Sequence, residues 1–191
     1  MLDTDLKKFN PPFLVHSNIF RTYSLIKNIV LNTPINNEII EKNLKYLDKN
    51  FSKKNIAFPT FNYDFPKTGI FDIQNTPSEV GALTNAVIQD NNFKRTAIPI
   101  FSYCVGENLK TNFSKSPFGI NSIFDYVFKN NGTIVYYGTR LSEGSTFLHF
   151  IETMFKVRYR YEKKFAGIIK NFKKETKVEI NFHVRPTALK L

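Results

Sequence analysis

The sequence has 191 residues, of which 42% are hydrophobic and 23% are charged, and its formal net charge is +11. This length and composition predict one globular domain, residues 1–191. The single cysteine, Cys104, excludes an internal disulfide and favours a reducing compartment. There is no apolar signal core and no run of roughly 18 apolar residues, so we expect a cytoplasmic protein without a membrane span.

The positive charge favours anionic partners such as nucleic acid, an anionic membrane or phosphate-bearing small molecules. The common phosphate-binding loops, G-x-x-x-x-G-K-[ST] and G-x-G-x-x-G, are absent, and so is the G-x-S-x-G elbow of hydrolases. One cysteine and three scattered histidines form no zinc pattern, so we predict no metal site. Cys104 lies in an apolar run, which is typical of a buried and inert thiol.

Strands and helices are expected to alternate through the first half of the chain. The expected elements are a buried strand over 13–17, an amphipathic helix over 37–51, a strand over 55–60 and an aromatic loop over 61–73. The first strand ends in His16 and Ser17, and α/β proteins place ligand contacts at such strand ends. Thr76 as N-cap, Pro77 in the first turn and Glu79 at N3 form a capping-box pattern, which predicts a helix from Thr76.

Further along, we expect an apolar strand over 97–106 with an edge position or bend at Pro99, a helix over 118–128 and a strand over 133–137. The segment 155–174 is strongly basic and its tyrosines alternate with charge, so it predicts a strand that pairs with 178–184 around a turn. Basic and aromatic residues also suit single-stranded nucleic acid, although an ordinary hairpin with a solvated face explains them better.

A helix is predicted to begin after Ser145, a suitable N-cap residue. On that helix Thr146, His149 and Glu152 share a polar face, while Phe147, Leu148 and Ile151 are expected to anchor another face in the core. Both assignments follow from the 3.6-residue repeat of a helix. A histidine with a carboxylate one turn away is the minimal unit for general-base chemistry, because the carboxylate fixes the imidazole tautomer. Spacing alone favours a plain surface pair, which is common on helices.

Several separated stretches, in order, resemble motifs of the aminoglycoside 3-N-acetyltransferase family. They are Val15-His16-Ser17 for "VHSS", Phe58 to Phe65 for "PTF" and its aromatic loop, Thr76 to Leu83 for "PSxVGAL", Arg95 with Pro99 and Ser102 for "RSxHPxxS", Phe118-Gly119 with Ser122 for "FGxxS", and Thr146 to Glu152 for "TxLHxxE". Each motif is short, but their ordered combination is specific. The resemblance covers roughly residues 13 to 185.

The resemblance implies an α/β fold, here a mixed sheet with flanking helices, and transfer of an acetyl group from acetyl-CoA to an amine of an aminoglycoside or related amino sugar. It implies that His149 is the general base and Glu152 its orienting carboxylate. Ser17 and Ser102 become candidates for binding the co-substrate. Asp64 and Thr146 become candidates for binding the amine substrate.

The chain departs from the family pattern at Ile98, where the family has a histidine, and at Asn18, where it has a second serine. It also ends soon after Arg185, whereas the family continues, so we expect the C-terminal part of the family to be missing. Two alternatives follow: an inactive remnant, and an acyltransferase acting on a nucleotide-linked amino sugar. The second is favoured by the net charge of +11, since aminoglycosides are polycations.

Overall fold

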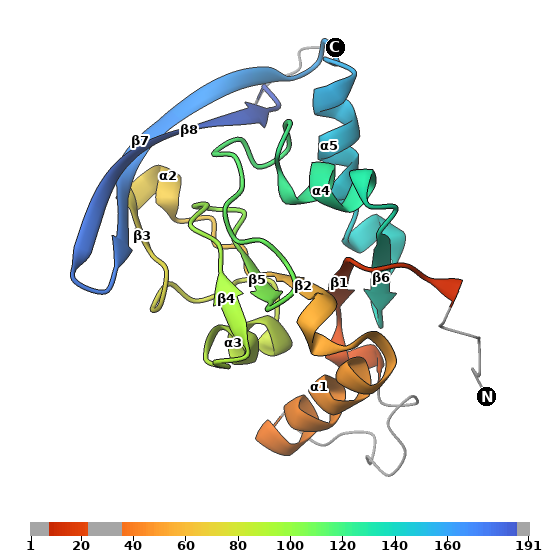
Figure 1. Ribbon diagram of the computed structural model, residues 1–191. Coiled ribbons are helices and arrows are strands. Elements are labelled where there is room, and N and C mark those ends of the chain that lie inside the picture. The colour runs from red at the N-terminus through yellow and green to blue at the C-terminus, as the bar shows by residue number, and fades with distance from the viewer. Residues whose placement is uncertain (1–7, 23–35, 187–191) are drawn as a thin grey trace.

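The computed structural model describes residues 8–22 and 36–186, which form two mixed sheets with flanking helices (Figure 1). The strands are β1 (Phe13–Ser17), β2 (Ile56–Pro59), β3 (Ile70–Asp72), β4 (Phe93–Arg95), β5 (Tyr103–Gly106), β6 (Thr133–Tyr137), β7 (Tyr161–Asn171) and β8 (Lys174–Val184). The helices are α1 (Asn37–Phe51), α2 (Phe65–Thr68), α3 (Ala82–Ile88), α4 (Ile123–Lys129) and α5 (Phe147–Met154). Within the described ranges, every helix is too short or too polar to cross a membrane.

The larger sheet has the order β4-β5-β2-β1-β6, with β1 parallel to β2 and β6 and β5 antiparallel to its neighbours. Its apolar strand β1 is buried on both faces, as expected for a strand covered by helices on two sides. Leu14 packs in a cluster with Phe124 of α4 and Phe150 of α5. Val15 points the opposite way, into a cluster with Leu47 of α1. The sheet is therefore the middle of three layers.

The smaller sheet has the order β3-β7-β8 and is dominated by the long hairpin of β7 and β8, which curves over one end of the molecule (Figure 1). One face of the hairpin is apolar: Val178, Ile180 and Phe182 are buried against Phe65 of α2. Phe101 packs against this cluster and against the cluster around Leu14, so its ring joins the two sheets.

The mixed α/β architecture is confirmed, and so are the strands 13–17 and 133–137, the helix 37–51 and the hairpin around a turn. These segments have an unbroken hydrophobic period, and their local preference agrees with their packing. The helix predicted over 118–128 begins only at Ile123, because Ser122 supplies the cap by accepting from the Asp125 amide at 3.2 Å. The predicted strand 97–106 is shortened to β5, and the bend at Pro99 is confirmed.

The helix predicted to start at Thr76 is wrong, because α3 starts six residues later at Ala82. The capping-box side chains bind elsewhere: the Thr76 hydroxyl accepts from the Asp72 amide at 2.9 Å, and the Glu79 carboxylate accepts from the Tyr63 amide at 2.8 Å. They therefore stabilise loops instead of a helix end. The aromatic loop 61–73 is also more regular than predicted, since it contains α2 and β3.

Candidate active site

Helix α5 carries the predicted catalytic pair, but it is anchored differently from the sequence prediction. Phe150 is its buried residue, at 4% exposure, whereas Leu148 and Ile151 are 52% and 38% exposed, so their predicted core role is wrong. The reason is that α5 packs mainly beside α4, and its contacts with the core come from the face that carries Phe147 and Phe150. Ser145 is also not the N-cap: Thr146 occupies that position, and the Ser145 hydroxyl donates to the Leu141 carbonyl.

His149 and Glu152 form a direct contact, with 2.8 Å between the imidazole Nδ1 and the carboxylate Oε2. The Glu152 side chain is only 13% exposed and that of His149 is 36% exposed. A solvated surface pair would have two exposed partners. This pair instead has one largely covered carboxylate and one partly exposed imidazole, which is the arrangement expected of a base with an orienting group.

Three further side chains converge on the Glu152 carboxylate. The Arg160 Nε lies 2.7 Å from Oε2, the Tyr159 hydroxyl donates to Oε1 at 2.8 Å, and the Arg185 Nη2 lies 3.5 Å from Oε1. Burial opposes ionisation of Glu152, but the hydrogen bonds from His149 and Tyr159 and the charge of Arg160 outweigh it and lower its pKa to about 2. Glu152 is therefore a carboxylate at every physiological pH.

This carboxylate determines which nitrogen of His149 is available to accept a proton. Among the described residues, the polar contacts of the imidazole all use Nδ1, which lies 2.8 Å from the Glu152 Oε2 and 3.0 Å from the Arg160 Nη2. A guanidinium only donates, so Nδ1 cannot accept from Arg160 while it donates to Glu152, and the ionised carboxylate favours the tautomer with the proton on Nδ1. When Nδ1 carries its proton and donates it to Glu152, Nε2 holds a lone pair that can accept a proton. The Phe118 ring stands edge-on to the imidazole at 5.1 Å between centroids, which restricts rotation of the ring.

His149 faces a groove of about 500 Å³ between α5, the β7–β8 hairpin and the bend before β5. Its walls are apolar and come from Ile100, Phe101, Phe118, Phe165 and Phe182. His149, Arg160, His183 and Arg185 supply its polar side. An apolar groove with a few convergent polar groups is the usual form of a small-molecule site.

The other predicted site residues do not line this groove. Ser17, at the end of β1, lines a second cavity of about 450 Å³ together with Asn18 and Gly81. Thr146 lies one helical turn before His149, whose amide donates to the Thr146 carbonyl at 3.0 Å. Asp64 is exposed at the start of α2. The structure thus brings His149, Glu152 and Thr146 together, and it separates Ser17 from them.

Ser102 is fully buried behind the groove, in a network with Thr60 and Arg95. Its hydroxyl donates to the Thr60 carbonyl at 2.8 Å and accepts from the Arg95 Nε at 3.1 Å. Arg95 donates again to the carbonyls of Thr60 and Thr76, at 2.9 and 2.5 Å. These contacts hold the ends of β2 and β5 together, and they use the bonding capacity of the Ser102 hydroxyl.

Two other candidates from the sequence are buried. His16 stacks on Tyr136 with 5.8 Å between ring centroids, and burial lowers its pKa to about 4, so its imidazole is neutral. Cys104 is 1% exposed, and burial raises the pKa of its thiol to about 12, which confirms that it is inert. Neither side chain lines the groove.

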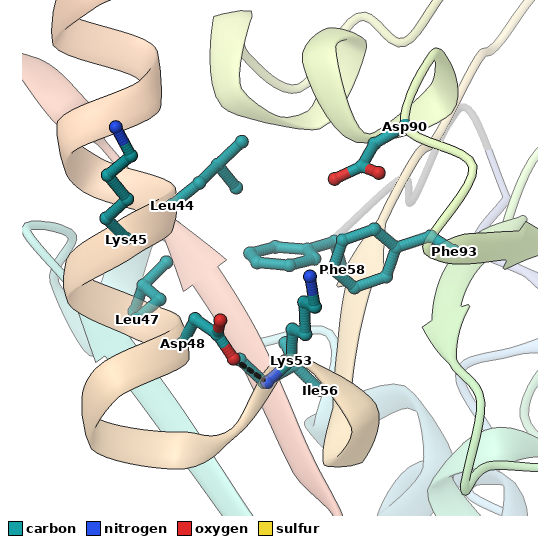
Figure 2. A pocket seen from close by; sticks show the side chains of 9 residues that line it. All are labelled: Leu44, Lys45, Leu47, Asp48, Lys53, Ile56, Phe58, Asp90 and Phe93. Atoms are coloured by element: carbon teal, nitrogen blue, oxygen red, sulfur yellow. Dashed lines mark hydrogen bonds between the residues drawn. The ribbon is translucent and has the colours of Figure 1, made fainter.

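A small cavity of about 120 Å³ lies at the other end of the larger sheet, between α1 and the strands β2 and β4 (Figure 2). The rings of Phe58 and Phe93 form its floor. Asp48 lies at its rim, where its carboxylate accepts from the Lys53 amide at 2.7 Å. This cavity is too small for a sugar or a pantetheine arm, and the groove at His149 remains the candidate active site.

Sequence reasoning missed Tyr159, Arg160 and Arg185, which support Glu152. Tyr159 and Arg160 belong to the segment 155–174, whose pattern predicts a strand with one solvated face, and Arg185 follows the predicted strand 178–184. A usable signal was present: Glu152 and Glu162 are the only acidic residues between residues 144 and 174. A carboxylate within a basic segment attracts several cations, and that concentration of charge marks a site.

The fold and the site define an α/β protein with a histidine–carboxylate pair beside an apolar groove. A family model described as aminoglycoside 3-N-acetyltransferase matches residues 45–187, and the chain belongs to this family. A search of curated protein sequences found no match.

Solved structures of this family have the same fold. The aminoglycoside acetyltransferase AAC(3)-IVa has a TM-score of 0.65 at 18% identity, with 93% of this chain and 65% of the other chain covered. The structure of AAC-IIIb with CoASH has a TM-score of 0.72 at 13% identity, and the match covers 96% of this chain and 74% of the other. The structure of sisomicin-bound AAC-VIa has a TM-score of 0.68 at 14% identity, and the match covers 94% of this chain and 72% of the other. This chain therefore spans about two thirds of the length of AAC(3)-IVa.

Proposed function

We propose that this protein transfers an acetyl group from acetyl-CoA to an amino group of an aminoglycoside or related amino sugar, with His149 as general base. The observation that carries the proposal is the 2.8 Å contact of His149 with a largely covered and ionised Glu152, beside an apolar groove. Family membership supports the reaction type. The solved relatives, with CoASH in one and sisomicin in another, support the two substrates.

The reaction follows from the orientation of the imidazole. The Nε2 of His149 takes a proton from the acceptor amine as the amine nitrogen attacks the thioester carbonyl carbon. A carbon–nitrogen bond forms, the carbon–sulfur bond breaks, and the CoA thiolate leaves and takes up the proton from Nε2. Glu152 stabilises the imidazolium that exists between these two proton transfers.

The co-substrate is assigned to the cavity at the end of β1. Ser17 and Asn18 offer a hydroxyl and an amide there, and the Asn18 Oδ1 has no hydrogen-bond partner among the described residues. The amides of a pantetheine arm can bond to such groups. Ser102 remains a prediction for co-substrate binding, and Thr146 and Asp64 remain predictions for acceptor binding.

A thiol-release assay tests the proposal, with acetyl-CoA and a panel of amino sugars that includes sisomicin. We expect CoA release with at least one acceptor and a fall in kcat/KM of roughly 10²- to 10⁴-fold in His149→Ala, since that is the usual contribution of a general base. Lys45→Ala, on the exposed side of α1, is the control and should leave the rate unchanged.

An inactive remnant predicts the opposite result. Release of CoA at the same rate by the wild type and by His149→Ala, with every acceptor in the panel, would rule out the proposed enzyme.

A further inference from the structure

Beside the groove lies another cavity, of about 580 Å³, which is distinct from the one at Ser17. It is formed between the end of α5 and the start of β7. Its cationic lining comes from Lys156, Arg158 and Arg160, and its acidic lining from Glu162. Arg160 and His183 line both this cavity and the groove, so the two spaces adjoin at these side chains. A ligand whose amine lies at His149 can therefore extend into this neighbouring cavity.

The charge available to a ligand comes mainly from two side chains. Arg160 is 8% exposed and is paired with Glu152 at 2.7 Å, so most of its charge is neutralised. Lys156 and Arg158 are exposed and form no ion pair within the described part of the chain. A polycationic acceptor would be repelled here, whereas a phosphate group could accept hydrogen bonds from both side chains.

We propose that this cavity, here named the basic cavity, binds the phosphate group of a phosphorylated amino sugar whose amine is acetylated at His149. The proposal deepens the proposed function and rests on it, because it names the acceptor class of the same site. It also accounts for the net charge of +11, which favours an anionic acceptor. Guanidinium groups are well suited to phosphate, so Arg158 is the principal contact and Lys156 adds a point charge.

The first experiment is a binding measurement that does not depend on catalysis. Calorimetric titration with glucosamine 6-phosphate and with glucosamine, both without acetyl-CoA, should show at least roughly tenfold tighter binding of the phosphorylated sugar. Arg158→Gln and, separately, Lys156→Gln should remove most of that preference. Lys173→Gln, a matched exposed cation in the hairpin turn and outside both cavities, should preserve it.

The second experiment identifies which substrate carries the phosphate. In the thiol-release assay, Arg158→Gln should raise the KM for glucosamine 6-phosphate by about tenfold and leave the KM for acetyl-CoA unchanged. If it raises the KM for acetyl-CoA instead, the basic cavity serves the phosphates of the co-substrate, and the proposal is overturned. Equal binding of the two sugars, or a preference that Lys173→Gln also removes, overturns it as well.

The two hypotheses fail in different ways. If no amine is acetylated but glucosamine 6-phosphate still binds through Arg158, the proposed function fails while the phosphate site itself stands. If amino sugars are acetylated without any preference for phosphate, the phosphate site fails while the proposed function stands.

Discussion

Arg95 and Arg160 each organise a cluster of polar side chains, and the two clusters differ in the bonding capacity that they leave available. Around Arg95, the hydroxyl of Ser102 is completely buried and is hydrogen-bonded to Thr60 as well as to the guanidinium. Around Arg160, the carboxylate of Glu152 is saturated, but the imidazole of His149 is 36% exposed toward a groove. The first cluster therefore has no bonding capacity left for a ligand, whereas the second leaves the imidazole of His149 open to one, as the proposed function requires.

The largest expected effect is a loss of folding stability when the Arg95 cluster is disrupted. Arg95→Met should lower the free energy of unfolding by about 3–5 kcal/mol, because it removes the donor to the Thr76 carbonyl, one of the two donors to the Thr60 carbonyl and the guanidinium bond to Ser102. Urea denaturation measures this change. The control is Lys94→Met on the same strand, which is exposed and should change stability by less than about 0.5 kcal/mol. Similar losses in both variants would contradict a structural role for the Arg95 cluster.

A fall in pH should weaken the cluster around Arg160, because it protonates Glu152. The pKa of Glu152 is lowered to about 2, so its ionised form stabilises the fold fully above about pH 5, and that contribution is lost as the pH falls toward 2. We expect the wild type to lose about 2 kcal/mol more than Glu152→Gln over this range, in urea titrations at successive pH values. Glu41→Gln, on the exposed face of α1, is the control and should follow the wild type. Parallel pH profiles for wild type and Glu152→Gln would disprove the linkage.

Ser102→Ala tests whether the Arg95 cluster also binds the co-substrate, as the family resemblance implies. Because the hydroxyl is buried and already bonded, we expect a stability loss of about 1–2 kcal/mol with an unchanged KM for acetyl-CoA. Ser17→Ala gives the matched comparison, since this serine lines a cavity and should raise that KM. A higher KM in Ser102→Ala would instead support the role implied by the resemblance.

The smallest effect is expected at the edge of the Arg160 cluster. Tyr159→Phe removes one of several donors to Glu152 and keeps the ring, so kcat/KM should fall only about two- to fivefold. Tyr126→Phe, on α4, is the control and should keep the full rate. A loss as large as that of His149→Ala would mean that Tyr159 takes part in the chemistry itself.

Local sequence patterns predicted the central strand and the hairpin because their periodicity agrees with their burial. The same reasoning failed at Thr76 and Glu79, where cap residues bind distant amides of the loops. It failed again at Leu148 and Ile151, since helical spacing shows that a face is apolar but not which neighbour covers it. Tertiary contacts decide both cases.

The candidate site was predictable only in part. His149 and Glu152 are three residues apart, and the structure brings them to 2.8 Å, as helical geometry requires. The supporting groups come from the following turn and from the far end of β8, and Arg160 reaches back to the His183 carbonyl at 3.0 Å. Their convergence depends on the register of the hairpin, which a pattern of single residues does not reveal.

The convergence on Glu152 also sets an order of events during synthesis. A nascent chain that has emerged only to residue 155 already contains His149 and Glu152, but Tyr159, Arg160 and Arg185 are still missing. The contacts of these three side chains with Glu152 can therefore form only after the hairpin has been synthesised. A gene fragment that preserves the Thr146 to Glu152 motif but lacks the hairpin would encode the signature without the groups that maintain it.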